Sequence, residues 1–115
     1  MRLSPIAPSI LLLSIATASG AAPAGPDINL VLKDHRFTPA TFSVPAGQKL
    51  RVALDNQDAA TEEFDSHDLK VEEVVTPHGR ISFTIGPLKP GTYSFMGEFH
   101  PATAQGRVIA VASGR

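Results

Sequence analysis

Residues 91–108 read GTYSFMGEFHPATAQGRV, and this stretch says more about the fold than any other part of the chain. Aromatic side chains alternate with polar ones at the start of residues 92–98, a segment with His100 follows, and residues 106–112 form a mostly apolar run with three β-branched residues. Alternation with a period of two, bounded by glycine and proline, is typical of β-strands. The stretch therefore predicts the last two strands of a sheet, with His100 in the loop that joins them.

The same pattern extends toward the N-terminus as short runs rich in β-branched and aromatic residues, interrupted by Pro, Gly, Asn or Asp. These runs predict strands over residues 28–33, 41–44, 50–55, 69–71, 73–75 and 81–85. Residues 56–66 are mostly polar and are predicted to form a loop. Beyond residue 22 no window shows a sustained helical period, so we expect an all-β sandwich or barrel of seven or eight strands.

The first residues carry the features of a secretory signal peptide. Arg2 precedes an apolar run over residues 10–15, and small residues follow as far as Ala22. The apolar run is much shorter than the roughly 20 residues that a membrane-spanning helix needs. We therefore predict that residues 1–21 are a signal peptide and that residues 22–115 form one exported domain, with no membrane span after cleavage.

The composition argues against several classes of protein. The 115-residue chain contains no cysteine, so hydrophobic burial rather than disulfide bonds must stabilise the domain. Its net charge of −1 at pH 7 gives no basic footprint for nucleic acid. The G-x-S-x-G and H-E-x-x-H motifs of common hydrolases are also missing from the sequence. Nucleic-acid binding and hydrolytic catalysis are therefore not expected.

Three segments combine into a recognisable pattern. Residues 33–56 read KDHRFTPATFSVPAGQKLRVALDN, residues 63–75 read EFDSHDLKVEEVV, and residues 85–111 read IGPLKPGTYSFMGEFHPATAQGRVIAV. In this combination the chain resembles the cupredoxins, and in particular the EfeO-type cupredoxin-like proteins found beside bacterial iron-permease systems. The resemblance implies a periplasmic Greek-key β-sandwich, in which the loop after the Asn-ending strand and the loop before the last strand meet at one end.

The resemblance also identifies what this chain lacks. A type 1 copper centre needs two imidazoles and a thiolate, usually with an axial methionine. When the chain is aligned with the family pattern, Glu63 or a close neighbour takes the position of the first copper-binding histidine. Gly97 takes the position of the cysteine, and Ala104 lies near that of the methionine. Only His100 remains in place. Electron transfer through a blue-copper site is therefore not expected, although the fold is.

We predict instead a metal site made of Glu63, Glu98 and His100, which the resemblance brings to one end of the sandwich. Met96 is the candidate fourth ligand, because it shares one side of its strand with Glu98, and His67 follows the first loop at the same end. Carboxylate and imidazole donors suit Cu(II), Fe or Zn, and the expected cofactor is a copper or iron ion. The alternative is that both carboxylates are solvated and that His100 is hydrogen-bonded to one of them.

The remaining histidines have simple interpretations. His35, beside Asp34, is interpreted as a surface imidazole, with a metal contact as the alternative. His67 lies in a charged loop, which explains it as well as a metal contact does. His78 is interpreted as a turn residue, because it stands between proline and glycine.

Two functions follow from this pattern. The first is a periplasmic metal-binding accessory protein of iron or copper transport, which serves an inner-membrane iron permease or other periplasmic transport components. The second is a metal-free interaction module, which uses the sandwich only to dock a partner in a periplasmic or membrane transport complex. Metal content separates the two hypotheses.

Overall fold

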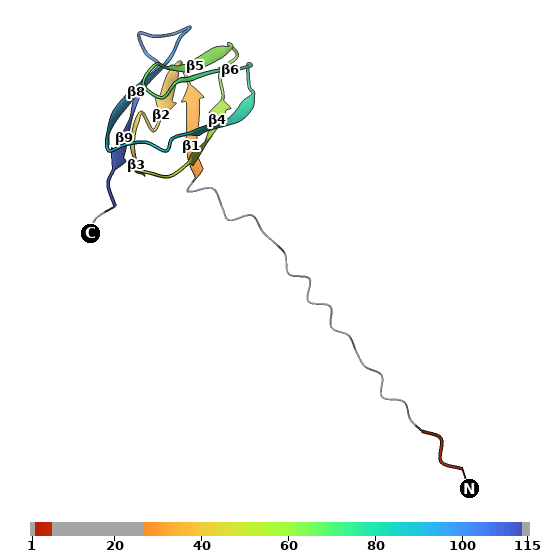
Figure 1. Cartoon of the computed structure of the whole chain (residues 1–115). Coiled ribbons are helices and arrows are strands. Elements are labelled where there is room, and N and C mark those ends of the chain that lie inside the picture. The colour runs from red at the N-terminus through yellow and green to blue at the C-terminus, as the bar shows by residue number, and fades with distance from the viewer. Residues whose placement is uncertain (1, 6–26, 114–115) are drawn as a thin grey trace.

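The computed structural model describes residues 2–5 and 27–113, and residues 27–113 form two packed β-sheets (Figure 1). The strands are β1 (Asp27–Lys33), β2 (Arg36–Thr38), β3 (Thr41–Pro45), β4 (Leu50–Asn56), β5 (Glu62–Ser66), β6 (Val71–Val75), β7 (Arg80–Ile85), β8 (Gly91–Gly97) and β9 (Gln105–Val111). One sheet has the order β2-β1-β4-β7 and the other the order β3-β9-β8-β5-β6. The predicted all-β sandwich is confirmed.

Two pairs of strands run parallel, β1 with β4 and β3 with β9, while the other neighbours run antiparallel. The chain therefore places β1 and β2 in the smaller sheet and then crosses to the larger one for β3. Because β1 and β4 point the same way, the turn that follows β1 and the connection that follows β4 lie at the same end of the domain (Figure 1).

The described residues contain nine strands, where seven or eight were expected. Two strands were not expected, β2 and β5, and the runs over residues 69–71 and 73–75 contribute one strand, β6, instead of two. Strand β5 lies within the predicted polar loop over residues 56–66. Its inward-facing residues Glu62, Phe64 and Ser66 are all buried, but two of them are polar, so the sequence shows no apolar alternation there. The strand forms because β6 and β8 flank it and bond to its backbone.

The inner faces of the two sheets meet in one hydrophobic core. Every second residue of β4 is buried, which is the alternation expected of a strand with one face inward. Phe64 lies at the centre of an aromatic group, with ring centroids 4.8 Å from Phe83, 4.9 Å from Phe95 and 5.9 Å from Phe37. Burial of each such ring contributes about 1.5–3 kcal/mol. Packing of this kind takes the place of disulfide bonds.

Three connections from different parts of the chain meet at one end of the sandwich: the β1–β2 turn, the start of β5, and the β8–β9 loop (top of Figure 1). The predicted signal peptide over residues 1–21 and the predicted domain start at Ala22 fall almost entirely outside the described residues. Within those residues, no helix is long and apolar enough to cross a membrane.

Candidate metal centre

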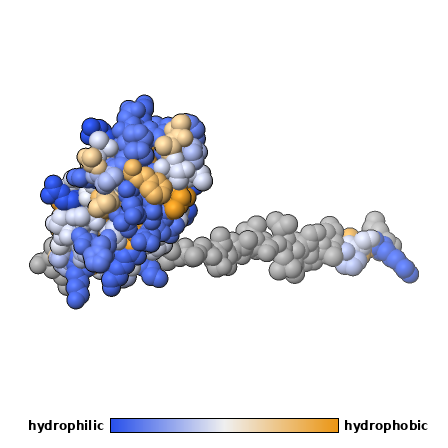
Figure 2. Space-filling view, turned by 90° about the horizontal axis from the view of Figure 1, so that it is seen from above, coloured by the Kyte–Doolittle hydropathy of each residue, from blue (hydrophilic) through white to orange (hydrophobic). Residues whose placement is uncertain are grey.

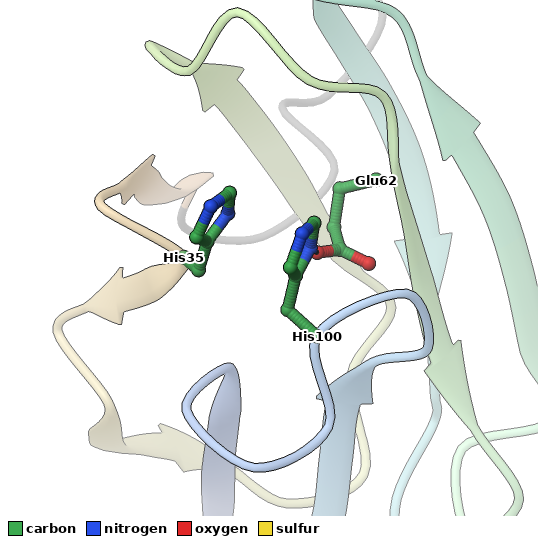
Figure 3. A group of neighbouring side chains, drawn as sticks. All are labelled: His35, Glu62 and His100. Carbon is green, nitrogen blue, oxygen red and sulfur yellow. Dashed lines mark hydrogen bonds and ion pairs between the residues drawn. The ribbon is translucent and has the colours of Figure 1, made fainter.

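Three side chains of the kinds that can bind a metal ion converge at this end of the domain: His35, Glu62 and His100 (Figure 3). His35 lies in the β1–β2 turn, Glu62 is the first residue of β5, and His100 lies in the β8–β9 loop. One ligand atom from each residue lies within 4.8 Å of the others. The site is therefore assembled from segments that are far apart in sequence.

Glu62 is the buried member of the group, with 1% of its surface exposed. Its Oε1 accepts hydrogen bonds from the backbone N–H of Phe99, at 2.8 Å, and of Glu63, at 3.0 Å. Its Oε2 lies 2.6 Å from Nδ1 of His100. A buried carboxylate is tolerated only when its oxygens are hydrogen-bonded, and these contacts satisfy both oxygens.

The room for this carboxylate comes from two small residues, Gly97 and Ala104. A Cβ atom at Gly97 would lie 2.6 Å from Cδ of Glu62 and 2.7 Å from Cβ of Ala104, well inside the roughly 3.5–4.0 Å at which carbon atoms make contact. The resemblance placed the missing copper cysteine at Gly97 and the missing methionine near Ala104. The Glu62 carboxylate lies directly against the first of these positions, and Ala104 packs against the same glycine.

His100 is held by the backbone of its own loop. Its N–H donates to the carbonyl of Gly97, and its carbonyl accepts from the N–H groups of Thr103 and Ala104. The side chain of His100 is 29% exposed, so the ring is partly accessible to solvent. Figure 2 looks down on this end of the domain, and the face it shows is mostly hydrophilic with scattered hydrophobic side chains.

His35 stacks on His100, with ring centroids 3.6 Å apart and an angle of 12° between the planes (Figure 3). The backbone reaches this position through a two-residue turn in which Asp34 and His35 both have positive φ, at 54° and 56°. The carboxylate of Asp58 accepts hydrogen bonds from the N–H groups of both turn residues, at 2.7 Å and 2.9 Å. Its Oδ2 also lies 3.5 Å from Nδ1 of His35.

The pKa of Asp58 is lowered from its ordinary value of 3.8. Burial raises this pKa, but the backbone hydrogen bonds from His35 and Asp34 outweigh that effect and hold the carboxyl in its charged form. The nearby imidazoles of His35 and His100 lower it further.

The lowered pKa makes the stability of the domain pH-dependent at acid pH. A group whose pKa is lower in the folded state stabilises that state above its unfolded pKa, and the contribution is lost as the pH falls through the folded value. We expect the difference in unfolding free energy between wild type and Asp58→Asn to shrink as the pH falls below about 4. Urea unfolding of both proteins over a pH series measures it. A difference that stays the same down to the acid limit would contradict the assignment.

The donor atoms decide which metal chemistry fits. A thiolate ligand is impossible because the chain contains no cysteine, so the residues do not fit a type 1 copper site. Two imidazoles and one carboxylate do fit borderline divalent ions such as Cu(II), Fe(II) and Zn(II). The cluster is thus a candidate site for such an ion, and its donors are nitrogen and oxygen only.

The structure places the other predicted ligands outside this cluster. Glu63 and Glu98 lie together on the outer side of the sheet, where the N–H of Glu98 donates to the carbonyl of Glu63. The pKa of Glu63 is raised, first by desolvation and then by the hydrogen bond and the charge of Glu98. Met96 is 41% exposed and alternates with the inward-facing Gly97, so it shares the outer face. Of the predicted ligands, only His100 belongs to the cluster.

His67 is exposed in the turn that follows β5, whereas Glu62 begins that strand. Five residues of extended chain separate them, which is roughly 16 Å. The expectation that His67 lies at the same end of the sandwich as His100 is therefore not met. His78 lies in a turn with a φ of 54°, in agreement with its interpretation as a turn residue.

Two members of the cluster were not identified as ligands from the sequence. Glu62 was included only as a close neighbour of Glu63, and a metal contact of His35 only as an alternative. A signal for Glu62 was present, because the aromatic Phe64 two residues later belongs inward and a strand alternates with a period of two. For His35 the signal was weaker. A two-residue turn between alternating segments favours Asn-Gly or Asp-Gly, and here histidine follows aspartate.

Comparison with known proteins agrees with the fold. A family model described as a cupredoxin-like domain matches residues 5–110. The chain is 45% identical over 83 residues to the uncharacterized protein RP394 of Rickettsia prowazekii (strain Madrid E), and the match spans 72% of this chain and 66% of that relative.

Solved structures with low sequence identity share the architecture. The metal binding domain of the Cu(I) exporting P-type ATPase CopA of Streptococcus pneumoniae D39 gives a TM-score of 0.67 at 12% identity, covering 79% of this chain and 90% of that chain. Auracyanin A, a blue copper protein of Chloroflexus aurantiacus, gives 0.66 at 14% identity, covering 76% and 99%. A purple cupredoxin of Nitrosopumilus maritimus gives 0.57 at 17% identity, covering 74% and 100%. These likenesses concern the fold, and the family model that matches residues 5–110 shows that the chain belongs to the cupredoxin-like domain family.

Proposed function

We propose that this protein binds one divalent metal ion through His35, Glu62 and His100, and that it acts after export as an accessory protein of copper or iron handling. The observation that carries the proposal is the convergence of these side chains from three separate segments, within 4.8 Å of one another. Burial of Glu62 strengthens it, because a carboxylate inside the domain is stabilised further when a cation neutralises its charge.

The chemistry of the three donors favours some ions over others. Sites made of nitrogen and oxygen donors bind Cu(II) more tightly than Fe(II) or Zn(II), whereas Cu(I) prefers sulfur ligands. We therefore expect Cu(II) to bind most tightly and Fe(II) more weakly. The side chains of His35 and His100 are both partly exposed, which leaves the ion a route to and from solvent, as metal transfer to a partner requires.

The resemblance to proteins found beside iron permeases supports a role in the periplasm next to a membrane transporter. An inner-membrane iron permease is the partner proposed on that basis. Without a thiolate ligand, the protein is expected to deliver or hold the ion rather than to carry electrons as blue-copper proteins do.

One observation favours the second candidate function, a metal-free interaction module. His100 and Glu62 already pair at 2.6 Å, and in the described part of the chain no buried side-chain nitrogen or oxygen lacks a partner. The buried polar atoms of the cluster therefore have hydrogen-bond partners without an ion. In this second function the cluster only fixes the loops at this end of the sandwich. Metal content decides between the two functions.

The experiment is elemental analysis by mass spectrometry of the untagged mature protein, loaded with Cu(II) and then dialysed. We expect about one ion per chain in the wild type and loss of at least about 90% of it in His100→Ala, because imidazole supplies the least replaceable donors of such a site. His67→Ala is the matched control and should keep the wild-type content. No retained metal in the wild type would favour the interaction module, whereas equal metal in His100→Ala would show that the ion binds elsewhere.

A further inference from the structure

We infer that Asp58, which is not one of the three ligands, is a positioning residue that holds the β1–β2 turn in the conformation that presents His35 to the metal centre. The inference rests on the proposed metal binding and adds to it a residue whose role is to build the site. It is carried by the conformation of the turn and by the hydrogen bonds that fix it.

The turn conformation is unusual for its sequence. Asp34 and His35 have φ values of 54° and 56°, so two successive residues other than glycine occupy the left-handed region. Two-residue hairpin turns of this kind favour glycine at the second position, where this chain has His35. Such backbone conformations persist when contacts with the surrounding structure hold them in place, and they are concentrated at functional sites. The choice of histidine where glycine fits best points to a use for its imidazole.

Asp58 supplies what holds the turn in place. Its Oδ1 accepts from the N–H of Asp34 at 2.7 Å and its Oδ2 from the N–H of His35 at 2.9 Å. One carboxylate thus binds both central N–H groups of the turn. The backbone N–H and the ring Nδ1 of His35 both contact the Asp58 carboxylate, and the ring also stacks on His100.

Asp58 is itself fixed by a buried amide. Asn56 is 1% exposed, its Oδ1 accepts from the N–H of Asp58, and its Nδ2 donates to the carbonyls of Ala60 and Thr76. The carbonyl of Asp58 accepts from the N–H of His78. A continuous set of hydrogen bonds therefore runs from a buried side chain through Asp58 to the turn that carries His35.

The first test compares Asp58→Ala and Asp58→Asn with wild type by isothermal titration with Cu(II) and by electron paramagnetic resonance. Loss of a residue that orients a ligand typically weakens metal binding about 10- to 100-fold, and we expect this for Asp58→Ala. In the electron paramagnetic resonance spectrum, the hyperfine splitting from nitrogen should also change from the pattern of two coordinated imidazoles to that of one. Asp58→Asn should lose less, because its carbonyl oxygen still accepts one of the two N–H groups. Asp55→Ala, a carboxylate on neighbouring β4 paired with Arg80, is the control and should match wild type.

The second test separates positioning from a general structural role. If Asp58 acts through His35, then Asp58→Ala should cause no further loss of Cu(II) affinity in a protein that already carries His35→Gly. An equal further loss in that background would overturn the inference, as would wild-type affinity and an unchanged spectrum in Asp58→Ala. If wild type itself binds no Cu(II), the proposed function fails and the inference with it. If Asp58→Ala does not fold, Asp58→Asn replaces it in the comparison with wild type and in the His35→Gly background.

Discussion

Replacement of Glu62 by alanine is expected to destabilise the domain by about 3–5 kcal/mol and to abolish metal binding. The carboxylate accepts from two backbone N–H groups and contacts His100, so its removal leaves these groups without their partner inside the structure. A small domain has only about 5–15 kcal/mol of stability in total, so the loss would be a large fraction of it.

Urea unfolding and Cu(II) titration measure the two effects separately. Glu62→Gln should recover much of the stability, because its carbonyl oxygen still accepts from the backbone, but it should bind Cu(II) at least about 10-fold more weakly for lack of charge. Glu63→Gln is the matched control, since Glu63 is the adjacent residue on the outer face. It should stay within about 0.5 kcal/mol of wild type. Stability of Glu62→Ala equal to that of this control would refute the argument.

Replacement of Gly97 by alanine is also expected to have a large effect. It should destabilise the domain by about 1–3 kcal/mol and reduce Cu(II) affinity at least about 10-fold. The added methyl group would overlap Cδ of Glu62 and Cβ of Ala104. Neither can move cheaply, because the first is held by hydrogen bonds in a buried site and the second is attached directly to the backbone. Relief of the overlap would push the Glu62 carboxylate out of line with His100.

Thermal unfolding and Cu(II) titration of Gly97→Ala check this expectation. The control is Met96→Ala, the preceding residue of β8, whose side chain is exposed and whose loss should change neither quantity. The double variant Gly97→Ala with Ala104→Gly removes one of the two overlaps and should recover part of both losses. Wild-type Cu(II) affinity in Gly97→Ala would mean that the position of the Glu62 carboxylate does not depend on the space left by Gly97.

Local patterns predicted most of the sheets. Strands β4, β7 and β8 show clear apolar alternation, and each was expected within a residue or two of its observed bounds. Strand β5 was missed because a buried glutamate and a buried serine flank its single core aromatic, and polar inward positions look like a loop in sequence. Only pairing with β6 and β8 makes that segment a strand.

The candidate site was predictable only in part. His100 was identified from its loop, because that loop joins two recognisable strands. The choice between Glu62 and Glu63 depended on register, and a shift of one residue moves a side chain to the opposite face of a sheet. His35 was left as an alternative, since nothing near it in sequence connects it to His100.

The sequence by itself determined that the chain is an all-β domain without a thiolate copper site, because alternation and the lack of cysteine are properties of the chain alone. Only the tertiary structure decided which side chains meet. The parallel pairing of β1 with β4 brings the His35 turn and the start of β5 to the same end, and the β8–β9 loop brings His100 against Glu62. Distances between residues 35, 62 and 100 are set by sheet packing, which no local segment of the sequence encodes.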